Sequence, residues 1–309
     1  MKILHWTSLL LSLVMGGCLA ASPTSALGVS PALRQAQGDA VAAQRDTGAQ
    51  GDVGVAPHAS HVTIVLMENR DYNLVAGNSA APYFNKTLVP QGVLLRNSHA
   101  ITHPSEPNYL ALFSGSTHGL NSDQCPFNVG KAANVASELI AAKKTFTGYA
   151  ESMPHDGFNG CYTANGLFAR KHVPWLDFSN VPAADDLVYN GWKTTNVASF
   201  VWITPNMCND MHDCSTQTGD TWLSKNLPPI IAWDKANDGL LIVTWDEADP
   251  DNSGTNHIAT VFVGPMIKPG VADTQNVNHY GVLHTIETIF GLKCIASDCQ
   301  APVVSGIWQ

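Results

Sequence analysis

Charged residues are scarce in this sequence: they make up 13% of its 309 residues, whereas 45% are hydrophobic. It has no lysine- or arginine-rich run, and its formal net charge is −9. These features exclude the basic surface of a nucleic-acid-binding protein, so we expect no nucleic-acid partner. An acidic protein that binds phosphate must gather positive charge locally, from a metal ion, histidines or helix N-termini.

The N-terminal region lacks an apolar run long enough to span a bilayer. The run from Leu9 to Met15 is too short for an anchor. Lys2 precedes it and small residues follow it, which is typical of a secretory signal peptide over residues 1–21. Residues 15–18 loosely resemble a lipoprotein box, but a methionine stands where an aliphatic residue is usual. We therefore expect a secreted protein with no stable membrane span, rather than a periplasmic or lipid-anchored one.

Aromatic residues and sustained periodicity are both absent from residues 22–58. Such a segment cannot bury enough apolar surface to offset the entropy lost on ordering, so the composition predicts a disordered linker. Residues 59–309 remain, and we expect them to form one globular domain.

The cysteines include no Cys-x-x-Cys pair, and their spacings do not fit a zinc site. One of the seven cysteines lies in the predicted signal peptide, which leaves an even number that favours disulfides in an exported chain. Short loops favour pairs between sequence neighbours, although other pairings are open. The predicted set is Cys208–Cys214, Cys294–Cys299 and, by what remains, Cys125–Cys161.

Strand-like and helix-like segments alternate along the chain. Residues 62–67 are a nearly continuous apolar run, typical of a strand buried on both faces of a parallel sheet. Further strands are expected over residues 92–100, 145–150, 200–204, 240–245 and 257–263. Helices are expected over residues 81–89, after Ser105, and over 134–142, 220–233 and 281–290. This alternation predicts an α/β fold with a mainly parallel central sheet and helices on both faces. Residues 151–195 are expected as a loop excursion over the site.

Polar pairs follow two of the predicted strands at the point where each strand ends. Glu68 and Asn69 follow the first, and Asp246 and Glu247 follow the most apolar one. In parallel sheets the ligand lies beyond the carboxyl ends of the strands. Hard divalent cations prefer oxygen ligands, so two such pairs favour a site for one divalent metal ion of unknown identity. If only one such pair were present, its side chains would be interpreted as solvated groups or as caps of the next helix.

The segment from His103 to Tyr109 places Ser105 between two prolines, directly before a helix-like run. Serine becomes a useful nucleophile only where a base, a metal or a positive field stabilises its alkoxide. The free N–H groups of a helix N-terminus suit an anionic, phosphoryl substrate. Taken alone, the segment is equally compatible with a turn that merely caps a helix.

Three histidines are candidates for binding the phosphoryl group and protonating a leaving alcohol. His103 lies two residues before Ser105, His172 ends the densest basic spot, and His212 follows a strand end. His279 lies at the start of the last predicted helix. It is equally compatible with lining the site and with packing inside the fold.

Five motifs resemble, in their order, a known family. They are Glu68-Asn69-Arg70, His103 to Tyr109, Arg170 to Trp175, Asn209 to Asp213 and Thr244 to Glu247. They are similar to the bacterial phosphoesterase family of acid phosphatases and phospholipases C, in the alkaline-phosphatase-like superfamily. Within it, the resemblance is strongest to secreted acid phosphatases that act on phosphatidylinositol 3-phosphate. The likeness implies an alkaline-phosphatase-like fold and makes residues 59–309 a phosphoesterase catalytic domain.

The resemblance also implies roles for the candidate residues. Ser105 would be the nucleophile and form a phosphoserine intermediate. The implied ligands of one divalent metal ion are Glu68, Asn69, Asp246, Glu247 and the Ser105 oxygen. The groups implied to contact the phosphoryl group are Asn69, His103, His172 and His212.

The implied activity is that of a secreted acid phosphatase, a phosphoric monoester hydrolase. Phosphoinositide headgroups are among the substrates that the resemblance suggests. A phospholipase C-type phosphodiesterase remains the alternative, because it shares the whole constellation of residues.

Overall fold

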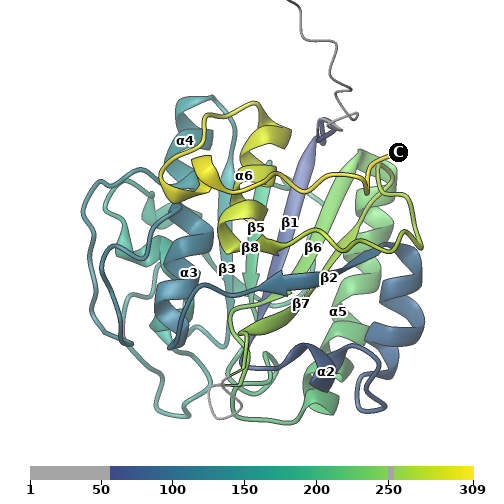
Figure 1. Cartoon of the computed structure of the whole chain (residues 1–309). Coiled ribbons are helices and arrows are strands. Elements are labelled where there is room, and N and C mark those ends of the chain that lie inside the picture. The colour runs from purple at the N-terminus through teal and green to yellow at the C-terminus, as the bar shows by residue number, and fades with distance from the viewer. Residues whose placement is uncertain (1–55, 250–253) are drawn as a thin grey trace, which may run out of the picture. The chain divides into compact units, whose positions relative to one another are not determined.

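The computed structural model describes residues 56–249 and 254–309 (Figure 1). The predicted signal peptide over residues 1–21 and nearly all of the predicted linker over residues 22–58 lie outside the described residues. Within the described residues, no helix combines the length and the apolar character that crossing a membrane requires.

One mixed sheet forms the centre of the described domain. Its eight strands lie in the order β4-β3-β5-β1-β6-β7-β2-β8. Their bounds are β1 His61–Met67, β2 Val93–His99, β3 Phe146–Glu151, β4 Asp186–Tyr189, β5 Phe200–Thr204, β6 Gly239–Trp245, β7 His257–Val263 and β8 Val277–Asn278. Only the pairings of β7, with β6 and β2, are antiparallel among these strands. The predicted mainly parallel sheet is therefore confirmed.

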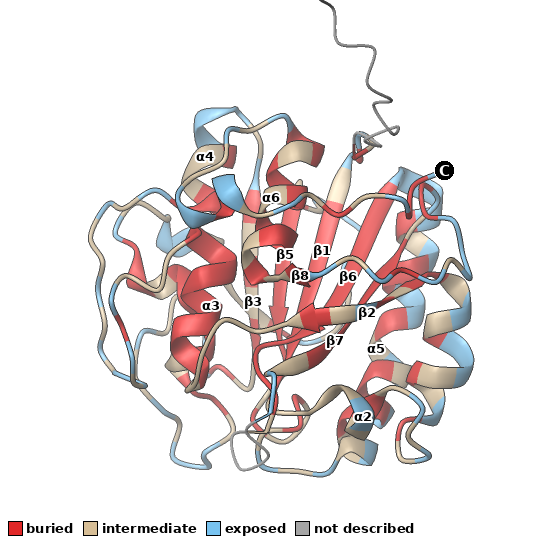
Figure 2. Cartoon of the chain, in the orientation of Figure 1, coloured by how far each residue is buried: buried red, intermediate tan, exposed pale blue. Residues whose placement is uncertain are grey.

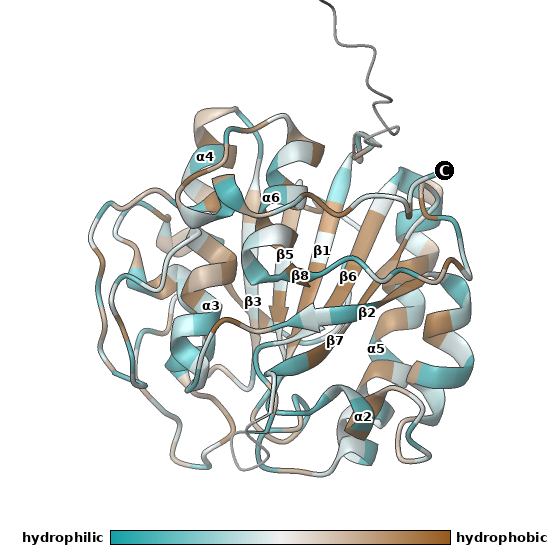
Figure 3. Ribbon diagram, viewed as in Figure 1, coloured by the Kyte–Doolittle hydropathy of each residue, from teal (hydrophilic) through white to brown (hydrophobic). Residues whose placement is uncertain are grey.

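Helices cover both faces of the sheet, as predicted. Alternate residues of β1 point to opposite sides: Ile64 and Leu66 enter one hydrophobic core, and Val65 and Met67 enter another. The first core packs under α3 (Ser105–Ser114), α4 (Val135–Ala141) and α6 (His279–Phe290), which lie in front of the sheet in Figure 1. The second packs under α5 (Thr216–Asn237) and the π-helical turn η1 (Phe84–Leu88). A strand covered on both sides must be apolar throughout, and Figures 2 and 3 show β1 and β6 as mostly buried and hydrophobic.

Several elements differ from their predicted extent. Residues 82–91 form a continuous helical stretch, as predicted for 81–89, but it passes from two α-helical residues through the π-helical turn η1 into the 3₁₀ turn η2 (Val89–Gln91). Helix α5 begins earlier than predicted, since Ser215 caps it by accepting from the Thr218 N–H. The short helix α2 (Tyr72–Val75) was not predicted.

The excursion over residues 151–195 is not one plain loop. It contains β4 at the edge of the sheet and the short 3₁₀ turns η3 (Arg170–His172), η4 (Pro174–Asp177) and η5 (Ala183–Asp185). A further 3₁₀ turn, η7 (Ser297–Gln300), follows α6.

All three predicted disulfides are present. They join Cys125 to Cys161, Cys208 to Cys214, and Cys294 to Cys299. The first ties the 151–195 excursion to the segment after α3, and the second closes the loop that follows β5.

Candidate active site

The carboxyl ends of β1 and β6 meet at one edge of the sheet. Met67 pairs with Trp245 in the parallel register, so Glu68 and Asp246 are the next residue of each strand. The Asn69 N–H donates to Asp246 Oδ1 over 3.1 Å, which fixes the two strand ends against each other. The structure thus brings the two predicted pairs, Glu68-Asn69 and Asp246-Glu247, to one place.

Ser105 reaches this edge as the first residue of α3. The turn before it is held by the Asn108 side chain, whose Oδ1 accepts from the Ile101 and Thr102 N–H groups at 3.0 and 3.1 Å. Its Nδ2 donates to the carbonyls of Thr102 and Pro104, at 2.9 and 3.3 Å. One amide side chain therefore fixes the whole turn that carries the serine.

The Ser105 hydroxyl faces three of the predicted ligands. Its Oγ lies 3.1 Å from Glu68 Oε2, 3.4 Å from Asn69 Oδ1 and 3.2 Å from Glu247 Oε1. Glu68, Asp246 and Glu247 are buried, as is Ser105 itself. The hydroxyl has two carboxylates within reach that can accept its proton.

Burial makes these carboxyl groups hard to ionise. It raises the pKa of Asp246 to about 7, and burial together with the Asp246 charge raises the pKa of Glu247 to about 9. Burial, Asp246 and Asp210 likewise raise the pKa of Glu68 well above its usual value. A cation among these groups would reverse the effect, because it favours the charged form of each carboxylate.

The arrangement of the oxygens fits such a cation. One terminal atom of the Asn69 amide lies 2.7 Å from Glu68 Oε2 and 3.3 Å from Asp246 Oδ1. As nitrogen this atom donates to both carboxylates, and as oxygen it joins them as a ligand for a cation. The other oxygen of Asp246 is buried without a hydrogen-bond partner. Hard oxygen atoms that face one another are the donor set that a hard divalent cation requires.

His172 lies inside the site. It is buried, with Nε2 3.0 Å from Glu68 Oε1 and Nδ1 3.5 Å from Asp210 Oδ2. Its ring stacks on Tyr109 at a centroid distance of 5.0 Å, and the Tyr109 hydroxyl donates to Glu68. Burial, then the nearby Lys171 charge, lowers the pKa of His172 well below its usual value. His172 is thus placed to support Glu68, although the resemblance assigned it to the phosphoryl group.

The other two candidate histidines, His103 and His212, are partly exposed to solvent. His103 is 33% exposed and its Nδ1 lies 2.6 Å from Glu247 Oε2. His212 is 23% exposed and its Nδ1 lies 2.8 Å from Asp213 Oδ1. Burial lowers the pKa of both histidines. These two rings are therefore better placed than His172 to meet a ligand that enters from solvent.

A second group at the site has the spacing of metal ligands. Glu68, His172 and His212 each offer a ligand atom, and these atoms lie within 4.8 Å of one another. Glu68 thus belongs both to this group and to the oxygen cluster around Ser105. Of the two alternatives for His279, the structure shows packing. The residue is buried, and its Nε2 lies 2.6 Å from the Asp246 carbonyl.

Three residues of the site were not among the candidates predicted from the sequence. Asp210 carries a signal, because it lies in the motif that contains His212. Lys171 also carries one, since it lies in the basic spot that contains His172. Asp123, which accepts from Lys171 Nζ over 2.7 Å, has no sequence signal, because it lies in a loop with neither periodicity nor a motif.

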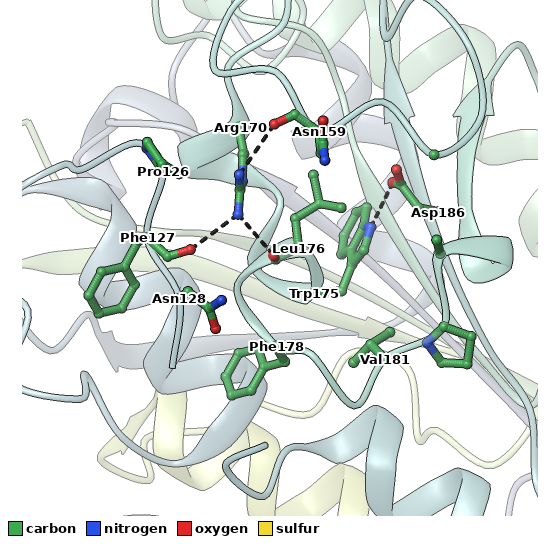
Figure 4. Close-up of a pocket in the computed structure, with 13 residues that line it drawn as sticks. Pro126, Phe127, Asn128, Asn159, Arg170, Trp175, Leu176, Phe178, Val181 and Asp186 are labelled. Carbon is green, nitrogen blue, oxygen red and sulfur yellow. Dashed lines mark hydrogen bonds between the residues drawn. The ribbon is translucent and has the colours of Figure 1, made fainter. Parts of the chain in front are cut away.

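A cavity of about 460 Å³ lies in the loops beside the site (Figure 4). Its walls are mostly apolar and include Phe127, Trp175, Phe178 and Val181. None of the predicted catalytic or metal-binding residues lines it. This cavity is therefore separate from the cluster around Ser105.

Comparisons with known proteins give a consistent result. The pattern of the phosphoesterase family matches residues 78–293. The chain is 43% identical to the phosphatidylinositol-3-phosphatase of Mycobacterium tuberculosis, over 84% of this chain and 88% of that protein. It is 32% identical to an acid phosphatase of Aspergillus fumigatus, but spans only 57% of that protein's length.

Solved structures agree on the fold. A protein of the alkaline phosphatase superfamily from Vibrio parahaemolyticus matches with a TM-score of 0.54 and 13% identity, over 80% of this chain and 71% of that one. A lipoteichoic acid synthase from Listeria monocytogenes matches with a TM-score of 0.54 and 10% identity, over 82% and 78%. The expected alkaline-phosphatase-like fold is confirmed. Together with the extent of the family match and the 43% identity to one relative, this shows that the chain belongs to the phosphoesterase family.

Proposed function

We propose that this protein is a secreted acid phosphatase that hydrolyses phosphate monoesters through a phosphoserine intermediate. The observation that carries the proposal is the placement of the Ser105 hydroxyl, at the start of a helix and within 3.1 to 3.4 Å of Glu68, Asn69 and Glu247. Relatives named acid phosphatase and phosphatidylinositol-3-phosphatase support the same activity. Three disulfides are consistent with export.

In the first step, the Ser105 Oγ attacks phosphorus. Its proton passes to one of the two carboxylates within reach, Glu68 or Glu247. The bond between phosphorus and the ester oxygen breaks, and the departing oxygen takes a proton from His212. We favour His212 over His172 as this acid because it is 23% exposed, whereas His172 is buried against Glu68.

In the second step, water attacks the phosphoserine and releases phosphate. The water gives one proton to the deprotonated His212, and the Ser105 oxygen recovers its proton from the carboxylate. A divalent cation held by Glu68, Asn69, Asp246 and Glu247 would stabilise the serine alkoxide and draw charge from the phosphoryl oxygens. Positioning and positive charge around these oxygens should supply most of the lowering of the barrier.

The test compares wild type and Ser105→Ala on p-nitrophenyl phosphate and on p-nitrophenyl phosphorylcholine. We expect the wild type to prefer the monoester and the variant to lose at least about 10³-fold in turnover. Ser224→Ala, on α5, is the matched control and should keep wild-type rates. Retained activity in Ser105→Ala would remove this residue from the mechanism. A preference for the phosphorylcholine ester would establish the phospholipase C-type alternative instead.

A further inference from the structure

Two neighbouring basic residues on η3 point to different surroundings. Arg170 points to the loops beside the cavity of Figure 4, where its guanidinium donates to the carbonyls of Asn159, Phe127 and Leu176. Lys171 points to His212 of the candidate site, with its Nζ 3.4 Å from His212 Nε2. The guanidinium of Arg170 is thus engaged in hydrogen bonds to the loops, whereas the ammonium of Lys171 lies at the candidate site.

The ammonium of Lys171 is held in place. Its Nζ lies 2.7 Å from Asp123 Oδ2, and the side chain is only 10% exposed. The other oxygen of Asp123 accepts from the Glu106 N–H over 3.1 Å. Glu106 is the residue after Ser105, so Asp123 joins the ammonium to the same helical turn that carries the serine.

The imidazole of His212 leaves the ammonium available. Its Nδ1 faces Asp213 Oδ1 at 2.8 Å, and its Nε2 faces Lys171. As the imidazolium it accepts no proton from Lys171, and after giving up its Nε2 proton it can accept one N–H. Nζ has three protons, and the contacts to Asp123 and His212 use at most two. One N–H of Lys171 therefore remains for an incoming ligand.

The charge balance of the site calls for this cation. Glu68, Asp246 and Glu247 are three buried carboxyl groups at one site. Arg70 is also near, but its guanidinium donates to the carbonyls of Asn69 and Cys214, at 2.6 Å each. A single divalent cation offsets two carboxylates and leaves a bound phosphoryl group without a counter-charge.

We infer that Lys171 binds the phosphoryl group and makes the site selective for doubly charged phosphoryl groups, that is, for monoesters over diesters. A phosphate monoester carries close to two negative charges at pH 7, whereas a diester carries one. An ammonium in a partly buried site gains more from the dianion. The inference rests on the proposed phosphatase function and names the residue that sets its substrate class.

The experiment measures kcat/KM at pH 7 for p-nitrophenyl phosphate and bis(p-nitrophenyl) phosphate in wild type and Lys171→Met. In Lys171→Met we expect kcat/KM for the monoester to fall about 10²-fold and kcat/KM for the diester to fall by less than about 5-fold. The preference for the monoester is then largely lost. Inhibition by inorganic phosphate should weaken by a similar factor. Lys171→Arg, which keeps the charge, should retain most of the preference, and the exposed Lys193→Met is the control for a lost surface charge.

Equal losses on both esters, or no loss on the monoester, would overturn the inference. Thermal unfolding of each variant checks that the fold is kept, and Lys171→Gln provides the same comparison if Lys171→Met does not fold. Failure of the proposed function gives a different result, because the wild type would then hydrolyse neither ester or would prefer the diester.

Discussion

The hydroxyl of Ser105 lies 3.1 Å from Glu68 Oε2, although 37 positions separate the two residues in the sequence. Glu68 directly follows the central strand β1, and Ser105 begins α3. The contact exists because β1 and β2 run in the same direction in the sheet, so both chain segments leave it at the same edge. The candidate chemistry depends on this meeting of a strand end and a helix start.

Asp246→Asn should lose both bound metal and activity. The substitution keeps the volume of a buried side chain but removes one negative charge from the oxygen cluster. We expect at least about 10²-fold lower turnover of p-nitrophenyl phosphate and a matching drop in bound metal. Elemental analysis of the purified protein measures the metal directly. Full metal content in the variant would place the ion elsewhere, for example at the group of Glu68, His172 and His212.

Asn108→Ala should damage the site without touching a catalytic group. The side chain makes four hydrogen bonds to the turn before Ser105, and its loss leaves buried backbone groups without partners. We expect a loss of about 2 kcal/mol in the free energy of unfolding and a fall in kcat of at least about tenfold. Asn108→Asp keeps the acceptor and should fall between alanine and wild type. Wild-type kcat in Asn108→Ala would show that the turn needs no such support.

The pH dependence of the monoester reaction should show an acid optimum. Burial lowers the pKa of His212 from its usual 6.5, so the imidazolium that serves as the acid is lost as the pH rises through this lowered value. The hydrogen bond that His212 donates to Asp213 opposes that shift and raises the pKa. Asp213→Asn should therefore move the falling limb of kcat/KM to lower pH still. A wild-type rate that rises steadily up to pH 9 is incompatible with this assignment.

The sequence predicts the site best where a local motif can be combined with a general rule of the fold. The pairs Glu68-Asn69 and Asp246-Glu247 could be predicted to meet because parallel strands align their carboxyl ends. Ser105 could be singled out because prolines and a helix start surround it. The meeting of Asp123 with Lys171 could not be predicted, since it depends on the paths of two irregular loops.

Some elements also lacked a local signal. The antiparallel direction of β7 follows from its pairing with β6 and β2, and an apolar strand looks the same in either direction. Strand β4 has four residues, too few for a period to stand out within a loop rich in Pro, Gly and Asn.

A buried carboxyl group that takes no part in the proposed chemistry should affect stability. Burial, then a hydrogen bond and the charge of Asp298, raises the pKa of Glu287 on α6 from 4.5 to about 10. Because the folded state then binds a proton that the unfolded state releases, stability falls as the pH rises from about 4.5 towards 10. Glu287→Gln should be more stable than wild type by on the order of 2 kcal/mol at pH 8, and not at pH 4. Urea unfolding at both pH values checks this, and an equal difference at the two would refute it.

The most direct test of the account is to trap the covalent intermediate. Wild-type protein is mixed with p-nitrophenyl phosphate, quenched in acid within one turnover, digested and examined by mass spectrometry. We predict a phosphoryl group on Ser105, which disappears after longer incubation without substrate and is absent from Ser105→Ala. A phosphoryl group on a histidine, or an active enzyme with Ser105 never modified, would contradict the central claim.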